Sequence, residues 1–211
     1  MMIDQRAYLR DCMEAMAEFP DKFFDLAVVD PPYGIGVSVS MGRRKGEKHS
    51  GFHKFAGGDK AIPNAAYFEQ LFRVSKQQIV WGGNYMTEHL PPSPCWLLWD
   101  KKIPEAVTFA QYEMAWSSFK SSAKKFEQFP DQSHTGNRIH PTQKPIALYD
   151  WIFANYAKAG QKVLDTHLGS GSSRIAANKA GIDFWGYELD PDYFAAHEKR
   201  YANFVAQLRM F

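Results

Sequence analysis

The sequence predicts an α/β fold in which helices cover both faces of a mainly parallel β-sheet. Short apolar runs that end in an acidic residue, at 25–30 and 183–188, are typical of the buried strands of such a sheet. Stretches with helical periodicity alternate with these runs along the chain. A chain of 211 residues, 45% of them hydrophobic, is long enough to bury one core, so we expect a single domain over residues 1–211.

The expected elements follow in order along the chain. Strands are expected at 6–9, 25–30, 78–82, 95–100, 111–118, 162–166 and 183–188, of which 111–118 alternates in part and is expected to be antiparallel. Helices are expected at 13–18, 64–75, 145–158, 171–180 and 191–208, with a short helical stretch at 84–89. Segment 34–60 has many glycines and basic residues without a period, so we expect a long mobile loop there.

Asp30-Pro31-Pro32-Tyr33 directly follows an apolar strand, at the end where open α/β sheets bind ligands. The Asp30 carboxylate can accept a hydrogen bond from an amino group. The two prolines lack N–H donors, which leaves the Pro31 carbonyl available for the second hydrogen of that amine. Tyr33 offers a flat face on which a base can stack. The alternative interpretation is a strand that ends in a proline-rich turn.

A glycine-containing turn joins a strand that ends at Asp165 to a helix, and the next strand ends at Glu188. Gly169 and Gly171 would let the backbone approach a ligand closely. Glu188 lies 17 residues after Gly171, near the spacing at which an acid meets ribose hydroxyls in nucleotide-binding βαβ units. The phosphate-binding fingerprints are incomplete, so a nucleoside without pyrophosphate, such as S-adenosylmethionine, fits better.

These motifs together resemble one known family. Asp-Pro-Pro-Tyr at 30–33 and Asp-x-x-x-Gly-Ser-Gly-Ser at 165–172 are similar to motifs of the DNA amino-methyltransferases, which make N6-methyladenine or N4-methylcytosine. His-Pro-Thr-Gln-Lys-Pro at 140–145 is close to specific for this family. The order of the motifs resembles the circularly permuted β class, and residues 68–101 resemble short methylases often found in phages and prophages. The likeness covers nearly the whole chain.

The resemblance implies a Rossmann-like methyltransferase fold and S-adenosyl-L-methionine as cofactor. It implies methyl transfer to N6 of adenine in duplex DNA after base flipping, and Asp at position 30 favours adenine over N4 of cytosine. The catalytic residues it implies are Asp30, Pro31, Pro32 and Tyr33. The cofactor residues it implies are Asp11, His140, Thr142, Lys144, Pro145, Asp165, His167, Gly169, Ser170, Gly171, Ser172 and Glu188.

Two details of this expected site need separate mention. The family usually has Pro and Phe where this chain has Thr166 and His167, so the packing around the methionine part of the cofactor is expected to differ. The family fold also needs a strand beside the one that ends at Glu188, and residues 6–9 are the candidate. Asp11 would then accept from the N6 amine of the cofactor. Its alternative role is the N-cap of the following helix.

Contacts with duplex DNA are expected from two basic segments, although the net charge of the chain is only +2. One is the loop 34–60. The other is 119–139, a polar and basic stretch that we interpret as the target-recognition insert. The candidate DNA-binding residues are Arg43, Arg44, Lys45, Lys48, Lys120, Lys124, Lys125 and Arg138. Lys124 and Lys125 could equally be a solvated face. The family often dimerises, so a homodimer is a further expectation.

Other classes of protein fit the sequence less well. RNA and protein-glutamine methyltransferases use related Asn/Asp-Pro-Pro-aromatic turns, and a DNA-binding protein without catalysis is the other alternative. Cys12 and Cys95 suggest neither a disulfide framework nor, with the histidines, a metal site. The N-terminus lacks the apolar stretch of a signal peptide, and no apolar run reaches membrane-spanning length. We therefore expect a cytoplasmic enzyme without membrane partners.

Overall fold

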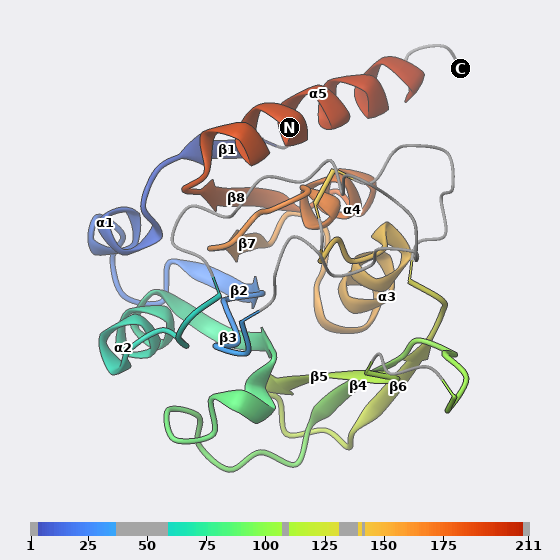
Figure 1. Cartoon of the computed structure of the whole chain (residues 1–211). Coiled ribbons are helices and arrows are strands. Elements are labelled where there is room, and N and C mark those ends of the chain that lie inside the picture. The colour runs from blue at the N-terminus through green and yellow to red at the C-terminus, as the bar shows by residue number, and fades with distance from the viewer. Residues whose placement is uncertain (1–3, 37–58, 107–109, 131–138, 141, 209–211) are drawn as a thin grey trace.

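The computed structural model describes residues 4–36, 59–106, 110–130, 139–140 and 142–208. In this part of the chain the strands form one sheet in the order β1-β8-β7-β2-β3-β5-β4-β6 (Figure 1). Their bounds are β1 Gln5–Leu9, β2 Phe24–Val29, β3 Ser75–Trp81, β4 Trp96–Asp100, β5 Tyr112–Ser117, β6 Lys124–Glu127, β7 Lys162–Asp165 and β8 Asp183–Glu188. Every neighbouring pair is parallel except the two that β5 makes, which confirms the expected mainly parallel sheet and its antiparallel strand.

Helices cover both faces of the sheet, as the sequence predicts (Figure 1). Their bounds are α1 Cys12–Ala17, α2 Ala65–Val74, α3 Ile146–Tyr156, α4 Ser172–Lys179 and α5 Pro191–Leu208, with a 3₁₀ turn η1 at Gly83–Tyr85. Side chains of β2 alternate between the two layers. Leu26 and Val28 pack in the cluster that includes α3 and α4, whereas Ala27 and Val29 pack in the cluster that includes α1 and α2.

The strand predicted at 6–9 is present and lies beside the strand that ends at Glu188, as expected. β1 pairs with β8 in parallel, with Leu9 opposite Glu188. Because β1, β8, β7 and β2 are all parallel, their carboxyl ends lie at one edge of the sheet, which brings Asp11, Glu188, Asp165 and Asp30 to the same edge. Among the described residues no helix has the length and apolar character needed to cross a bilayer.

Three elements differ from the expectation. β6 lies inside the segment 119–139, where no strand was expected, because its Lys-Lys-Phe-Glu sequence has almost no apolar signal and edge strands do not need one. The helical stretch expected at 84–89 is only the single turn η1. β3 begins at Ser75 rather than 78, since its first residues are polar and pair at the rim of the sheet.

Candidate active site

One large pocket lies at the carboxyl edge of the parallel strands and has a volume of about 830 Å³. This volume is within the usual range for a small-molecule site. The predicted site residues that line it are Asp11, Asp30, Pro31, Pro32, Tyr33, His140, Thr142, Lys144, His167, Gly169, Ser170, Ser172 and Glu188. Three other predicted cofactor residues, Pro145, Asp165 and Gly171, are not part of its lining. No group of side chains suited to hold a metal ion occurs in the part of the chain that the structure describes.

Asp165, at the end of β7, holds the glycine turn at 166–171 in place through two hydrogen bonds. Its Oδ1 accepts a hydrogen bond from the His167 amide at 3.0 Å, and its Oδ2 accepts from the Ser173 hydroxyl at 2.6 Å. The carboxyl is buried, and this burial raises its pKa to about 7. Asp165 therefore ties the strand end to the first turn of α4, and its expected contact with the cofactor stays a prediction.

The two glycines of this turn have different roles. Gly169 has a φ of +51° and donates its amide to Glu188 Oε2 at 2.8 Å, at the wall of the pocket. Gly171 has a φ of +70°, and a Cβ there would lie 2.3 Å from His197 Cδ2. Gly171 therefore lets the turn pack against α5. Its expected approach to the cofactor stays a prediction.

Glu188 is anchored at the end of β8 by backbone donors. Oε2 accepts from Gly169, and Oε1 accepts from the amides of Leu189 at 3.0 Å and Asp190 at 2.9 Å. Burial raises the pKa of this carboxyl above its ordinary value. A carboxylate fixed in this way can accept further hydrogen bonds from hydroxyl groups, since its two oxygens have about four lone-pair sites.

Asp11 follows β1, the strand that pairs with β8. Its Oδ1 accepts from the amides of Met13 at 2.7 Å and Glu14 at 3.4 Å, so the alternative role of Asp11 as the N-cap of α1 is confirmed. Asp11 also lines the pocket. The cap uses Oδ1, so the second carboxylate oxygen can still serve a ligand.

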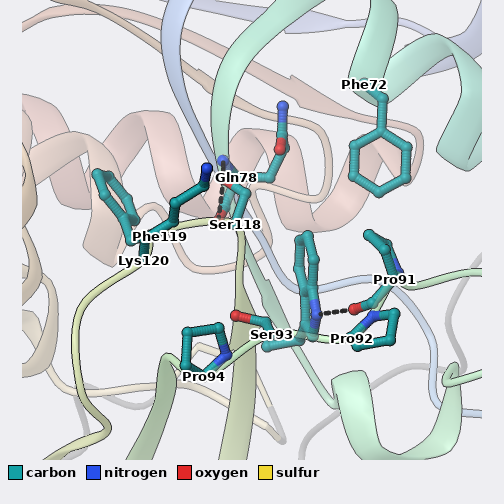
Figure 2. A pocket seen from close by; sticks show the side chains of 10 residues that line it. Phe72, Gln78, Pro91, Pro92, Ser93, Pro94, Ser118, Phe119 and Lys120 are labelled. Carbon is teal, nitrogen blue, oxygen red and sulfur yellow. Dashed lines mark hydrogen bonds between the residues drawn. The ribbon is translucent and has the colours of Figure 1, made fainter.

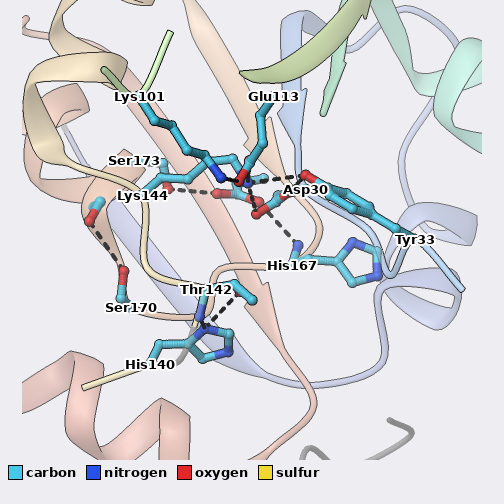
Figure 3. A network of polar contacts seen from close by, with 12 residues as sticks. Asp30, Tyr33, Lys101, Glu113, His140, Thr142, Lys144, His167, Ser170 and Ser173 are labelled. Atoms are coloured by element: carbon cyan, nitrogen blue, oxygen red, sulfur yellow. Dashed lines mark hydrogen bonds and ion pairs between the residues drawn. The ribbon is translucent and has the colours of Figure 1, made fainter. Parts of the chain in front are cut away.

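Asp30 and Tyr33 meet at the other side of the pocket (Figure 3). The Tyr33 hydroxyl donates to Asp30 Oδ1 at 2.6 Å. The Tyr33 ring stacks on Tyr85 with centroids 5.5 Å apart, and a Cβ at Gly82 would lie 2.2 Å from the Tyr33 ring. Burial together with the Asp30 charge raises the pKa of Tyr33 well above its ordinary value, so the phenol keeps its proton and donates it.

Lys144 lies beside Asp30, although the sequence placed it among the cofactor residues. Its Nζ is 2.5 Å from Asp30 Oδ2 and 3.2 Å from Glu113 Oε2, and Lys101 binds the other oxygen of Glu113 at 2.5 Å (Figure 3). Glu113 and Lys101 were missed by sequence reasoning. An acid inside an apolar strand is the signal that could have found Glu113, because a carboxylate is rarely buried without a partner.

A second, smaller groove of about 430 Å³ shares no lining residue with the first (Figure 2). It is lined by Phe72, Gln78, Trp116, Ser118, Phe119, Lys120 and the stretch Pro91, Pro92, Ser93 and Pro94. The Trp116 indole donates to the Pro91 carbonyl at 2.8 Å. Lys120 follows the carboxyl end of β5, which is antiparallel to β3, so it lies at the sheet edge opposite Asp30. This position argues against Lys120 binding the same substrate molecule as Asp30.

The other candidate DNA-binding residues are placed only in part. Lys124 donates to Asn155 at 2.7 Å, and Lys125 pairs with Glu127 on the same strand. These local partners favour the alternative of a solvated face. Within the described end of the 119–139 segment, Pro130 lines the large pocket. Arg43, Arg44, Lys45, Lys48 and Arg138 lie outside the described residues, as does most of the expected loop 34–60.

The comparisons with known proteins agree with this geometry. A family model described as DNA methylase, the N6/N4 methyltransferase family, matches residues 80–199, more than half of the chain, so the protein belongs to this family. Among known proteins, YubD from Escherichia coli (strain K12) is 28% identical over 206 residues, which cover 91% of this chain and 88% of YubD.

Two solved structures share the fold at low sequence identity. TTHA0409 from Thermus thermophilus, in complex with S-adenosyl-L-methionine, has a TM-score of 0.59 and 17% identity over 95% of each chain. The cytosine-N4-specific PvuII DNA methyltransferase has a TM-score of 0.63 and 13% identity over 92% of this chain and 85% of that chain. The fold is therefore that of the S-adenosylmethionine-dependent DNA methyltransferases, as the sequence predicted.

Proposed function

We propose that this protein is an S-adenosylmethionine-dependent DNA methyltransferase that modifies N6 of adenine in duplex DNA after the base has left the helix. One observation carries the proposal. A single pocket joins the Asp30 and Tyr33 pair at the end of β2 to Gly169 and Glu188 at the ends of β7 and β8. β2 and β8 are separated by one strand, so these groups are spaced by about 10 Å across the sheet edge.

The residues on the β8 side fit a nucleoside cofactor. Glu188 can accept from ribose hydroxyls, and the second oxygen of Asp11 can accept from an adenine amine. His140, Thr142, Ser170 and Ser172 add polar groups along the same wall. When bound, S-adenosylmethionine supplies an electrophilic methyl group. The residues of the chain hold that cofactor, exclude water from it and orient the target.

The residues on the β2 side fit an exocyclic amine. Such an amine is a poor nucleophile because its lone pair is delocalised into the base. Asp30 and the Pro31 carbonyl, by accepting both hydrogens of the amine, would favour a pyramidal nitrogen with its lone pair turned towards the cofactor. Tyr33 offers a stacking surface that offsets part of the few kcal/mol needed to flip a base. Positioning and fixed dipoles would supply most of the rate.

Adenine is favoured over cytosine by Asp at position 30. The alternative target, N4 of cytosine, has the support of the structural likeness to the cytosine-specific PvuII enzyme. The family match argues for DNA over RNA or protein as the substrate. The expected phosphate contacts of Arg43, Arg44, Lys45, Lys48 and Arg138, and the homodimer, remain proposals from the sequence.

Labelled methyl transfer tests the proposal directly. The purified protein is incubated with methyl-labelled S-adenosylmethionine and duplex DNA, RNA or protein, side by side. We expect label in DNA, and methylation-sensitive sequencing of DNA from expressing cells should give N6-methyladenine at one motif. N4-methylcytosine at a motif would show that the target base is cytosine and not adenine. Label in RNA or protein alone would contradict the proposal. Cofactor binding without turnover on any duplex would favour the non-catalytic alternative.

A further inference from the structure

A largely buried cluster of two acids and two lysines, of which Lys144 is the most buried, lies at the end of the pocket where the target amine is proposed to bind. It consists of Asp30 after β2, Lys101 after β4, Glu113 on β5 and Lys144 before α3 (Figure 3). The Lys144 side chain is only 4% exposed. Burial of so many charges is costly unless each is paired, so the arrangement calls for a specific reason.

Both oxygens of Asp30 are already engaged within the chain. Tyr33 donates to Oδ1 at 2.6 Å, and the Lys144 ammonium donates to Oδ2 at 2.5 Å. Lys144 Nζ also lies 3.2 Å from the Tyr33 hydroxyl. An ammonium is an N–H donor, as is an exocyclic amine, so Lys144 holds the kind of contact that the target amine must make with Asp30.

Glu113 is a second acid within reach of the Lys144 ammonium. Its Oε1 pairs with Lys101, whereas its Oε2 lies 3.2 Å from Lys144 Nζ yet makes no hydrogen bond within the described residues. A buried carboxylate oxygen left without a hydrogen bond is unfavourable. A small movement of the ammonium away from Asp30 would satisfy that oxygen. The four charges sum to zero before and after such a movement.

We propose that Lys144 occupies the place of the target amine on Asp30 in the ligand-free protein, and that Glu113 receives its ammonium when a base enters. Glu113 is then a positioning residue, which acts on the target through Lys144. This inference rests on the proposed function in naming a base as the entering group, although the transfer between the two acids can be tested without DNA. It makes Asp30 available only when a competing donor fills the pocket.

The electrostatic state of Lys144 agrees with this arrangement. Burial alone would lower its pKa, but Asp30 and Glu113 together hold that pKa above its ordinary value. The side chain therefore stays an ammonium in both positions. Lys144 does not act as the base that takes the amine proton, since it has no free lone pair.

A crystal structure of the Asp30→Asn variant tests the transfer without any substrate. The neutral side chain at position 30 lacks the negative charge that holds Lys144, and it thereby imitates an Asp30 carboxylate that is paired with another donor. We expect Lys144 Nζ to leave that side chain and to form a hydrogen bond with Glu113 Oε2 of about 2.8 Å. If Nζ stays on the side chain at position 30 and Glu113 Oε2 stays without a hydrogen bond, the transfer is wrong. This result does not depend on whether DNA is a substrate.

Kinetics of a double-mutant cycle test the consequence for catalysis. Glu113→Gln leaves the ammonium with Asp30 alone, so we expect kcat to fall roughly ten- to a hundredfold while the KM for S-adenosylmethionine is unchanged. Adding Lys144→Met removes the competing donor and keeps the cluster neutral, so the double variant should regain about tenfold over Glu113→Gln.

Glu127→Gln is the matched control, since Glu127 also pairs with two lysines, Lys102 and Lys125, but does not line the pocket. It should leave kcat unchanged. A double variant no faster than Glu113→Gln would mean that Glu113 only stabilises the fold, and it would overturn the positioning role. If the wild-type protein methylates no nucleic acid, the proposed function fails, and the Asp30→Asn structure still decides the transfer.

Discussion

At the scale of single residues, two carboxylates of the pocket, Asp30 and Glu188, differ in the kind of hydrogen-bond donor that holds them. Asp30 is bound by side chains, from Tyr33 and Lys144, which can move away when a ligand arrives. Glu188 is bound by three backbone amides, which hold it in one position whether or not a ligand is present. A carboxylate that must exchange partners suits a reacting group, and a fixed one suits the binding of a cofactor.

The first prediction concerns Asp30. Asp30→Ala should abolish methyl transfer, because the amine loses its charged acceptor, while cofactor affinity stays within about threefold of wild type. Turnover with labelled cofactor and isothermal calorimetry measure the two quantities. Asp25→Asn is the control, since Asp25 lies on β2, the strand that Asp30 follows, but pairs with Lys76 outside the pocket. Retention of most of the turnover in Asp30→Ala would rule out activation of the amine by this carboxylate.

The second prediction concerns Glu188. Glu188→Ala should weaken S-adenosylmethionine binding by ~1–3 kcal/mol, the cost of charge-assisted hydrogen bonds to hydroxyl groups. Calorimetry with the cofactor measures it. Asp192→Ala removes an exposed acid close by in sequence that does not line the pocket, so its affinity should equal that of wild type. Equal affinities for wild type and Glu188→Ala would show that the cofactor's ribose is held elsewhere.

At the scale of elements, the glycine turn is built as much for packing as for binding. Asp165 joins β7 to α4 through Ser173, and Gly171 allows α5 to lie against the turn. His197 of α5 is itself buried, and it bonds to Arg174 of α4 at 2.9 Å. The helix α5 therefore packs against the turn at Gly171, whereas Gly169 and Glu188 line the pocket.

The third prediction separates two reasons for glycine at position 171, which are its positive φ and the lack of space for a Cβ. Gly171→Ala should lower the free energy of unfolding more than Gly160→Ala does. Both positions have positive φ, but a Cβ at Gly160 meets nothing within 4 Å, whereas one at Gly171 collides with His197. Positive φ alone costs alanine about 1 kcal/mol, and the collision adds to it. Urea unfolding measures both variants, and equal losses would mean that backbone strain alone requires glycine at 171.

At the scale of the whole molecule, sequence reasoning succeeded where a local pattern carries the information. The acids at the ends of strands 25–30 and 183–188 could be placed at one sheet edge because parallel strands share a direction. Glu113 could not be placed, since its partners Lys101 and Lys144 come from other segments of the chain and only the tertiary fold brings them together. β6 was missed because an exposed edge strand has no apolar pattern.

The same global view explains how stability should depend on pH. Burial raises the pKa of Asp165 to about 7, whereas an unfolded aspartate has a pKa of about 3.9. Between these values the folded state binds a proton that the unfolded state has lost, so this carboxyl makes the protein less stable as pH rises. Burial lowers the pKa of His167 to about 4, below its unfolded value of about 6.5. This imidazole therefore makes the protein less stable as pH falls.

The fourth prediction uses these opposite signs. As pH rises from about 4 to about 7, the free energy of unfolding of Asp165→Asn should increase relative to wild type, because the variant lacks the penalty of ionising a buried carboxyl. That of His167→Gln should decrease relative to wild type over the same interval, because the variant lacks the penalty that wild type bears at the acidic end. Urea unfolding at several pH values measures each difference, which isolates one group from the other titrations of the chain. If the curve for Asp165→Asn ran parallel to that of wild type, the carboxyl beneath the glycine turn would be ionised throughout, and the turn would contain a buried negative charge next to the cofactor pocket.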